Sequence, residues 1–182
     1  RPRLPGVTSY RSLFRTPEFT PLFLGSAAQT AAGPVGGLAL GTLVYRAPGS
    51  PLLSPVSLFG PSMAQVLGAT VLLSGADRLP PRTALTAIAL VFTAGTALQA
   101  LPGLPVGAVF AVLLAMGLVA SLGGGVRWGL LNEILAKDGY LPGRSVFNMM
   151  SGLTQIAGFA TGGALLAALS PRVCLLLSAA LY

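Results

Sequence analysis

Residues 106–126 read VGAVFAVLLAMGLVASLGGGV and contain no charged side chain. A helix that crosses a bilayer needs about 20 consecutive, mostly apolar residues, because the hydrocarbon layer is about 30 Å thick. The length of this segment and its lack of charge therefore predict a transmembrane helix.

Similar apolar segments recur along the whole chain. We expect five spans, at 22–45, 52–74, 84–101, 106–126 and 146–169, followed by a truncated apolar segment at 173–182. None of the five spans contains a charged residue. Short Gly/Pro connections, such as 47–49 and 102–103, force successive helices to lie antiparallel as neighbours. The pattern predicts an all-α membrane protein, a bundle of about six transmembrane helices.

Composition supports this prediction. Of the 182 residues, 53% are apolar and 8% are charged, and the mean hydropathy is +0.79. Soluble domains carry about 25% charged residues, so this chain has too few charges to cover a globular surface exposed to water. The net charge of +7 raises the question of nucleic acid. Nucleic-acid binding needs a clustered basic patch, whereas these basic residues lie between apolar segments, so we expect no nucleic-acid partner.

The distribution of Arg and Lys predicts the orientation in the membrane. The N-terminal tail and the second and fourth connections hold nine basic residues, at positions 1, 3, 11, 15, 78, 82, 127, 137 and 144. The opposite side holds Arg46 and Arg172. Basic residues accumulate in cytoplasmic loops, so we expect a multi-pass protein of the cell membrane with a cytoplasmic N-terminus.

The side chains needed for catalysis or metal binding are scarce. The chain has no His, only four acidic residues scattered along the sequence, and one cysteine, Cys174. A catalytic dyad or a metal cage needs several such groups close together. We therefore expect no enzyme, no catalytic residue, no metal and no cofactor.

Small residues recur every four positions in three of the expected helices. These stripes comprise Gly33, Gly37 and Gly41; Gly117, Ser121, Gly125 and Gly129; and Thr154, Gly158 and Gly162. Small residues at this spacing let two helix backbones approach closely in lipid. The stripes fit either permanent tight packing or surfaces that slide during a transport cycle.

The connection after the second span reads LSGADRLPPR over residues 73–82. It resembles the cytoplasmic loop signature of the major facilitator superfamily: Ala76, Asp77, Arg78 and Arg82 match, whereas the residues at 73, 75, 80 and 81 depart from it. The resemblance implies a cytoplasmic latch between the two halves of a transporter. Its members here would be Asp77, Arg78, Arg82, Arg127 and Glu133. The alternative is that the arginines only anchor the loop in the cytoplasm and Asp77 caps the third span.

A second segment, TQIAGFATGG at 154–163, is similar to the antiporter motif of the same superfamily. Gly158, Gly162 and Gly163 match, while Thr154 and Phe159 replace a glycine and a proline. Two shorter segments also resemble drug exporters of the superfamily: residues 15–19 at the start of the first span, and Arg127 with residues 132–135 after the fourth.

These resemblances cover nearly the whole chain. They imply that residues 1–182 form the N-terminal six-helix half of a twelve-helix transporter, with the C-terminal half outside this chain as its partner. A fragment and a truncated gene product both fit this expectation. The implied function is export of a small organic or drug-like compound by alternating access, because the antiporter motif is associated with exporters and not with importers. Coupling of this export to protons is left open.

Uncharged polar residues inside the spans are candidates for a substrate path. They are Gln29, Thr30, Asn148 and Gln155. In the superfamily the first, second, fourth and fifth helices of this half line the central cavity. The other interpretation is that these side chains hydrogen-bond neighbouring helices and only stabilise packing. No Asp, Glu or His lies at mid-depth in a span, so a proton-coupling residue is expected either in the second half or at Asp77 or Glu133.

Two functions from different classes remain open. The first is a major facilitator carrier whose partners are a small-molecule substrate and the lipid bilayer. The second is a non-transporting polytopic subunit that acts as an anchor or assembly partner. Six further apolar segments downstream in the reading frame would favour the carrier.

Overall fold

The computed structural model describes residues 10–46, 53–72, 80–135 and 137–182, and every regular element within them is an α-helix. The helices are α1 (Tyr10–Leu13), α2 (Phe19–Arg46), α3 (Leu53–Leu72), α4 (Pro81–Gln99), α5 (Val106–Ile134), α6 (Lys137–Ala168) and α7 (Pro171–Leu181). The predicted all-α class is confirmed for these residues. Each of the six expected segments corresponds to one of the helices α2 to α7.

Two helices are longer than the apolar segments that predicted them. Helix α5 continues past 126 to Ile134, so Arg127 lies inside the helix and not beyond its end. Helix α6 starts at Lys137 instead of 146 and runs through Pro142. Both extensions add polar and charged turns, which a search for apolar residues leaves out.

Length and hydropathy identify two described helices that are able to cross a membrane. They are α4 and α5. Within the described residues α7 is apolar but shorter, and α6 carries Arg144 and a charged first turn.

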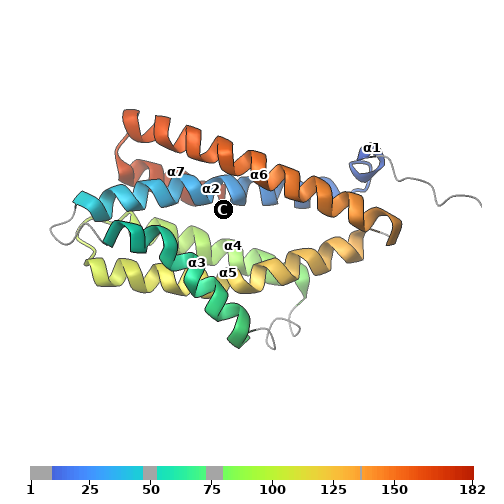
Figure 1. Ribbon diagram of the computed structural model, residues 1–182, viewed down its shortest axis with the longest axis horizontal. Helices are drawn as coiled ribbons and strands as arrows, with labels where there is room; N and C mark the ends of the chain where they lie inside the picture. Colours follow the sequence, from blue (N-terminus) through green and yellow to red (C-terminus); the bar gives the residue numbers. More distant parts are fainter. Residues whose placement is uncertain (1–9, 47–52, 73–79, 136) are drawn as a thin grey trace, which may run out of the picture.

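Five helices form a closed ring, and a sixth packs outside it. Around the ring, α2 contacts α3, α3 contacts α5, α5 contacts α4, α4 contacts α7, and α7 returns to α2. Helix α6 packs mainly against α2 on the outside, as Figure 1 shows. The ring encloses the space in which the candidate site lies.

Two apolar clusters hold the bundle together, one toward each end. The first joins α2, α5 and α7 and includes Leu40, Leu113 and Leu175. The second surrounds Phe19 and Phe147, whose ring centroids lie 5.6 Å apart in an edge-to-face contact. Aromatic pairs of this geometry contribute about 0.5–1.5 kcal/mol beyond their buried area. The second cluster therefore fixes the start of α2 against α5 and α6.

Two neighbouring residues, Ser170 and Pro171, determine where α7 begins. Ser170 precedes the helix, its Oγ accepts a hydrogen bond from the Val173 amide, and Pro171 occupies the first turn. Proline suits the first turn because its missing N–H has no partner there in any case. This start turns the chain back from α6 and brings α7 into the ring.

Candidate functional site: a polar cavity inside the helix ring

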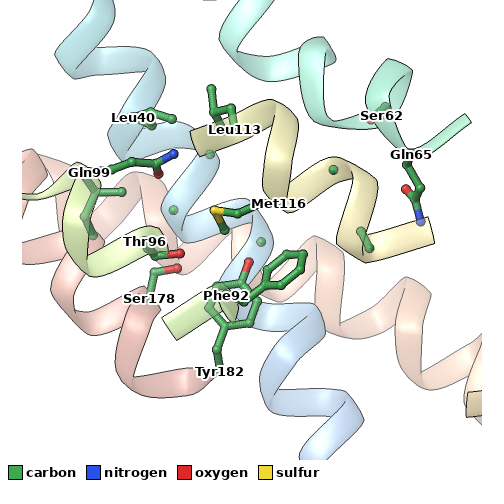
Figure 2. A pocket seen from close by; sticks show the side chains of 16 residues that line it. Leu40, Ser62, Gln65, Phe92, Thr96, Gln99, Leu113, Met116, Ser178 and Tyr182 are labelled. Atoms are coloured by element: carbon green, nitrogen blue, oxygen red, sulfur yellow. The ribbon is translucent and has the colours of Figure 1, made fainter. Parts of the chain in front are cut away.

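A cavity of about 260 Å³ lies between the five helices of the ring. Each helix contributes to its wall, including Gly33 and Gly37 of α2, Gln65 of α3, Thr96 of α4 and Met116 of α5. In Figure 2, Gln65 lies on one side of the cavity and Thr96 lies on the other. Both glycines line the cavity, and a Cβ at Gly33 would meet no described atom within 4 Å, so Gly33 leaves space at this wall.

One side of the cavity is built by a contact between α7 and α2. The hydroxyl of Ser178 donates a 2.8 Å hydrogen bond to the carbonyl oxygen of Ala32. A Cβ at Gly36 would lie 2.7 Å from the Ser178 Oγ and 4.0 Å from a methyl of Thr96. Only glycine at position 36 admits Ser178 this close, because any Cβ there would displace the hydroxyl.

A second hollow of about 230 Å³ adjoins the first. The two share Gln65, Phe92 and Tyr182 in their walls. The rings of Phe92 and Tyr182 lie 5.0 Å apart and are tilted by 53°, and Figure 2 shows them together at the edge of the first cavity. These two rings therefore form an aromatic wall between the hollows.

Arg127 supplies a positive charge to the second hollow. Its terminal Nη2 donates a 3.2 Å hydrogen bond to Oε1 of Gln29. Its Nε is buried and has no partner among the described residues. None of the described residues that line the two hollows is acidic. A buried charge without an opposite charge is unfavourable, so the guanidinium is suited to bind an acceptor or an anion that enters the hollow.

The predicted substrate-path residues separate into two pairs. Gln29 and Thr30 line the second hollow beside Arg127. Asn148 and Gln155 lie on the exposed surface of α6, outside the ring, where Gln155 Nε2 donates a 3.4 Å hydrogen bond to Ser151. The structure thus places half of the predicted set at the second hollow and the other half outside the ring.

No described member of the predicted latch forms an ion pair with another described member. Arg82 forms an exposed ion pair with Glu18, a residue outside the predicted set. Arg127 points to Gln29, and Glu133 is exposed and forms no ion pair with any described residue. Asp77 and Arg78 lie outside the described residues, so their part in the latch stays a prediction.

The antiporter-like motif lies where α6 crosses α2. A Cβ at Gly158 would come within 3.2 Å of the Ala31 carbonyl oxygen, and one at Gly162 within 3.2 Å of the Val35 Cα. Gly163 has nothing within 4 Å. Two of the three motif glycines therefore permit close contact between the backbones, whereas the third faces open space.

Several cavity residues were not predicted from the sequence. They are Gln65, Phe92, Thr96, Gln99, Ser178 and Tyr182. The sequence does offer a weak signal for three of them, because Gln65, Thr96 and Gln99 are polar residues inside predicted spans, as Gln29 is. Ser178 and Tyr182 give no such signal, since they belong to the short apolar segment at 173–182.

Comparison with protein-family models, with curated proteins and with solved structures gives no match for this chain.

Proposed function

We propose that this chain is the N-terminal half of a secondary transporter of the major facilitator type, which exports a small organic compound by alternating access. In this proposal the chain is a multi-pass protein of the cell membrane with about six spans and a cytoplasmic N-terminus. The cavity in the ring and the adjoining hollow, which holds Arg127 and Gln29, contribute to the substrate path. The single observation that carries the proposal is the guanidinium of Arg127 inside the bundle.

A charged group within a membrane helix is expensive, and such groups generally mark substrate or ion pathways. Arg127 is seven residues before the end of α5, a helix apolar enough to span. Its side chain turns inward to a hollow and to Gln29. An arginine that only anchored the helix at the cytoplasmic surface would extend toward water instead, as long basic side chains do near helix ends.

The outer surface of the bundle supports a lipid environment. Large apolar side chains are exposed on several helices, including Phe59 and Met63 on α3 and Leu153, Ile156 and Phe159 on α6. Soluble monomers rarely expose contiguous apolar patches above a few hundred Å². A bilayer, together with the proposed second half, would cover these side chains. The polar Asn148 and Gln155 on the same helix would then face the second half.

The substrate class follows from the walls of the two hollows. They combine the aromatic rings of Phe92 and Tyr182 with amide and hydroxyl groups and one guanidinium. Sites with mostly apolar walls and a few placed polar groups bind amphipathic organic molecules. The proposed substrate is therefore a small amphipathic compound with an acceptor or acidic group for Arg127.

The test is dye efflux from proteoliposomes that contain the full-length protein. Arg127→Gln removes the charge and keeps hydrogen-bonding capacity, and it should reduce efflux of carboxyfluorescein at least tenfold at equal protein in the membrane. Arg144→Gln is the matched control, because Arg144 lies over the Trp128 ring at 5.2 Å and lines neither hollow. Unchanged efflux in Arg127→Gln would show that the hollow around Arg127 is not part of the transport path. A full-length protein that moves neither this anionic dye nor ethidium would favour the anchoring subunit.

A further inference from the structure

A separate hollow of about 300 Å³ lies at the end of the bundle where α2 and α4 end and where α5 and α7 begin. Its apolar wall consists of Leu40, Leu43, Val44, Leu104, Val106 and Val109. The remaining lining includes three donor side chains, Arg46, Gln99 and Arg172. Neither arginine takes part in the proposed transport path.

Two arginines that are far apart in the sequence, Arg46 and Arg172, line this hollow, and both are exposed. Arg46 is the last residue of α2, and Arg172 lies in the first turn of α7. Neither forms an ion pair with a described residue. The acidic side chains that the structure describes are distant, since Glu18 precedes α2 and Glu133 lies in the last turn of α5. A helix of this length spans roughly 40 Å, so no described carboxylate neutralises the two guanidinium groups.

The start of α5 adds further donors. Pro105 occupies the N-cap position, and no side chain in the described part of the chain caps this end of the helix. The first N–H groups of a helix have no partner within the helix, and the helix dipole makes that end attractive to anions. Val106, the first residue of α5, forms part of the wall.

Gln99 provides an independent sign of a missing acceptor. Its side chain is 5% exposed, and its Nε2 has no hydrogen-bond partner among the described residues. Buried polar groups nearly always have a hydrogen-bond partner, and a buried group without one destabilises the fold. The side chain lies at the boundary between this hollow and the central cavity, because it lines both.

We propose that this hollow binds a phosphate group, with Arg46 and Arg172 as its charged ligands and Gln99 as a donor from the inner wall. Planar guanidinium groups form paired hydrogen bonds to phosphate oxygens. The apolar wall beside them fits the first carbons of a phospholipid, whose headgroup phosphate would then be the occupant. Free inorganic phosphate would accept the same hydrogen bonds from these donors, but it has no carbon chain to cover the apolar wall.

The experiment measures binding of phosphatidylglycerol to the purified chain in dodecyl maltoside by native mass spectrometry. Phosphatidylcholine with the same acyl chains is the comparison lipid, because its choline adds a positive charge beside the two arginines. We expect a clear preference for phosphatidylglycerol. The double variant R46Q/R172Q should weaken its binding at least tenfold, as expected for the loss of charged hydrogen bonds.

The matched control is R11Q/R15Q, which removes the same charge from exposed positions before α2. It should bind phosphatidylglycerol as the parent chain does. Q99L, which keeps the size of the side chain, should weaken binding without changing the net charge. Competition by inorganic phosphate identifies the source: displacement at millimolar concentration assigns the site to free phosphate, and no displacement assigns it to the lipid. Equal binding of the two lipids, or equal losses in R46Q/R172Q and R11Q/R15Q, would overturn the proposal.

Discussion

Ser178 of α7 donates a buried hydrogen bond to the carbonyl oxygen of Ala32 in α2 across 146 positions of sequence. This bond closes the ring of helices, because α7 is the element that joins α4 to α2. The hydroxyl reaches the α2 backbone only because Gly36 has no side chain. Serine and glycine therefore act as a pair, and their substitutions are expected to be coupled.

Gly36→Ala should lower the unfolding temperature of the chain in detergent. The new Cβ would lie 2.7 Å from the Ser178 Oγ, so the hydroxyl has to move and the bond to Ala32 is lost, at a cost of about 1 kcal/mol or more. Gly33→Ala is the control, since its Cβ would meet nothing within 4 Å and alanine favours helix by up to ~1 kcal/mol over glycine.

The double variant Gly36→Ala with Ser178→Ala tests the coupling itself. Once the hydroxyl is gone, the alanine at position 36 loses its closest contact. The combined loss should therefore be smaller than the sum of the two single losses, as it is for residues in direct contact. Strictly additive losses would mean that Gly36 is needed for some reason other than Ser178.

The two glycines at the end of the antiporter-like motif should respond differently to the same substitution. Gly162→Leu should separate α6 from α2 and destabilise the bundle by more than about 1 kcal/mol, because overpacking a tight contact costs roughly 1–3 kcal/mol. Gly163→Leu should be tolerated, since that position is open. Thermal unfolding of the two variants, monitored by circular dichroism, provides the comparison. Equal stability would mean that position 162 meets lipid.

The positions of the helices along the chain were largely predictable from the sequence, whereas the pairs of helices that pack against each other were not. Length and apolarity alone place α2 to α5 to within a few residues at their starts. The extra turns of α5 and α6 escaped prediction because they carry charges such as Glu133 and Arg144. Helix α1 is a single turn of four residues, too short to show any periodicity.

The candidate site could not be predicted from local sequence patterns. Gln29 and Gln155 are both glutamines in predicted spans. Gln29 lines the second hollow, whereas Gln155 is exposed on α6. The difference arises from which helices close the ring, and pairing between helices far apart in sequence leaves no local pattern. The sequence shows that Arg127 is charged, but it does not show that the side chain points into the bundle. That direction is seen from its hydrogen bond to Gln29, which is 98 positions away.

The orientation prediction can be tested by cysteine labelling in a Cys174→Ala background. Cys174 is fully buried, so the parent chain should react with maleimide only after unfolding. Cysteines at the exposed positions Leu101 and Leu141 should then label from opposite sides of the membrane in whole cells. The bias of basic residues predicts Leu101→Cys outside and Leu141→Cys inside. The reverse pattern would falsify the cytoplasmic N-terminus and, with it, the latch.

The proposed latch predicts a shift between the two states of the full-length carrier. Asp77→Asn removes one charge and preserves the shape of the side chain. If Asp77 binds the arginines in the outward-facing state alone, its loss should favour the inward-facing state by the free energy of that interaction. A cysteine placed in the cytoplasmic half of the cavity should then be labelled faster, while the protein still reaches the membrane in normal amounts.

Glu18→Gln is the matched control, because it removes the described ionic partner of Arg82 without touching position 77. The side chains of Arg82 and Glu18 are 71% and 49% exposed, and exposed pairs contribute about 0–1 kcal/mol. Labelling in Glu18→Gln should therefore stay close to that of the parent protein, whereas labelling in Asp77→Asn rises. Equal increases in both variants would indicate that Arg82 works through Glu18 and that the charge before α2 belongs to the latch. No increase in either variant would leave Arg78 and Arg82 as cytoplasmic anchors and Asp77 as a helix cap.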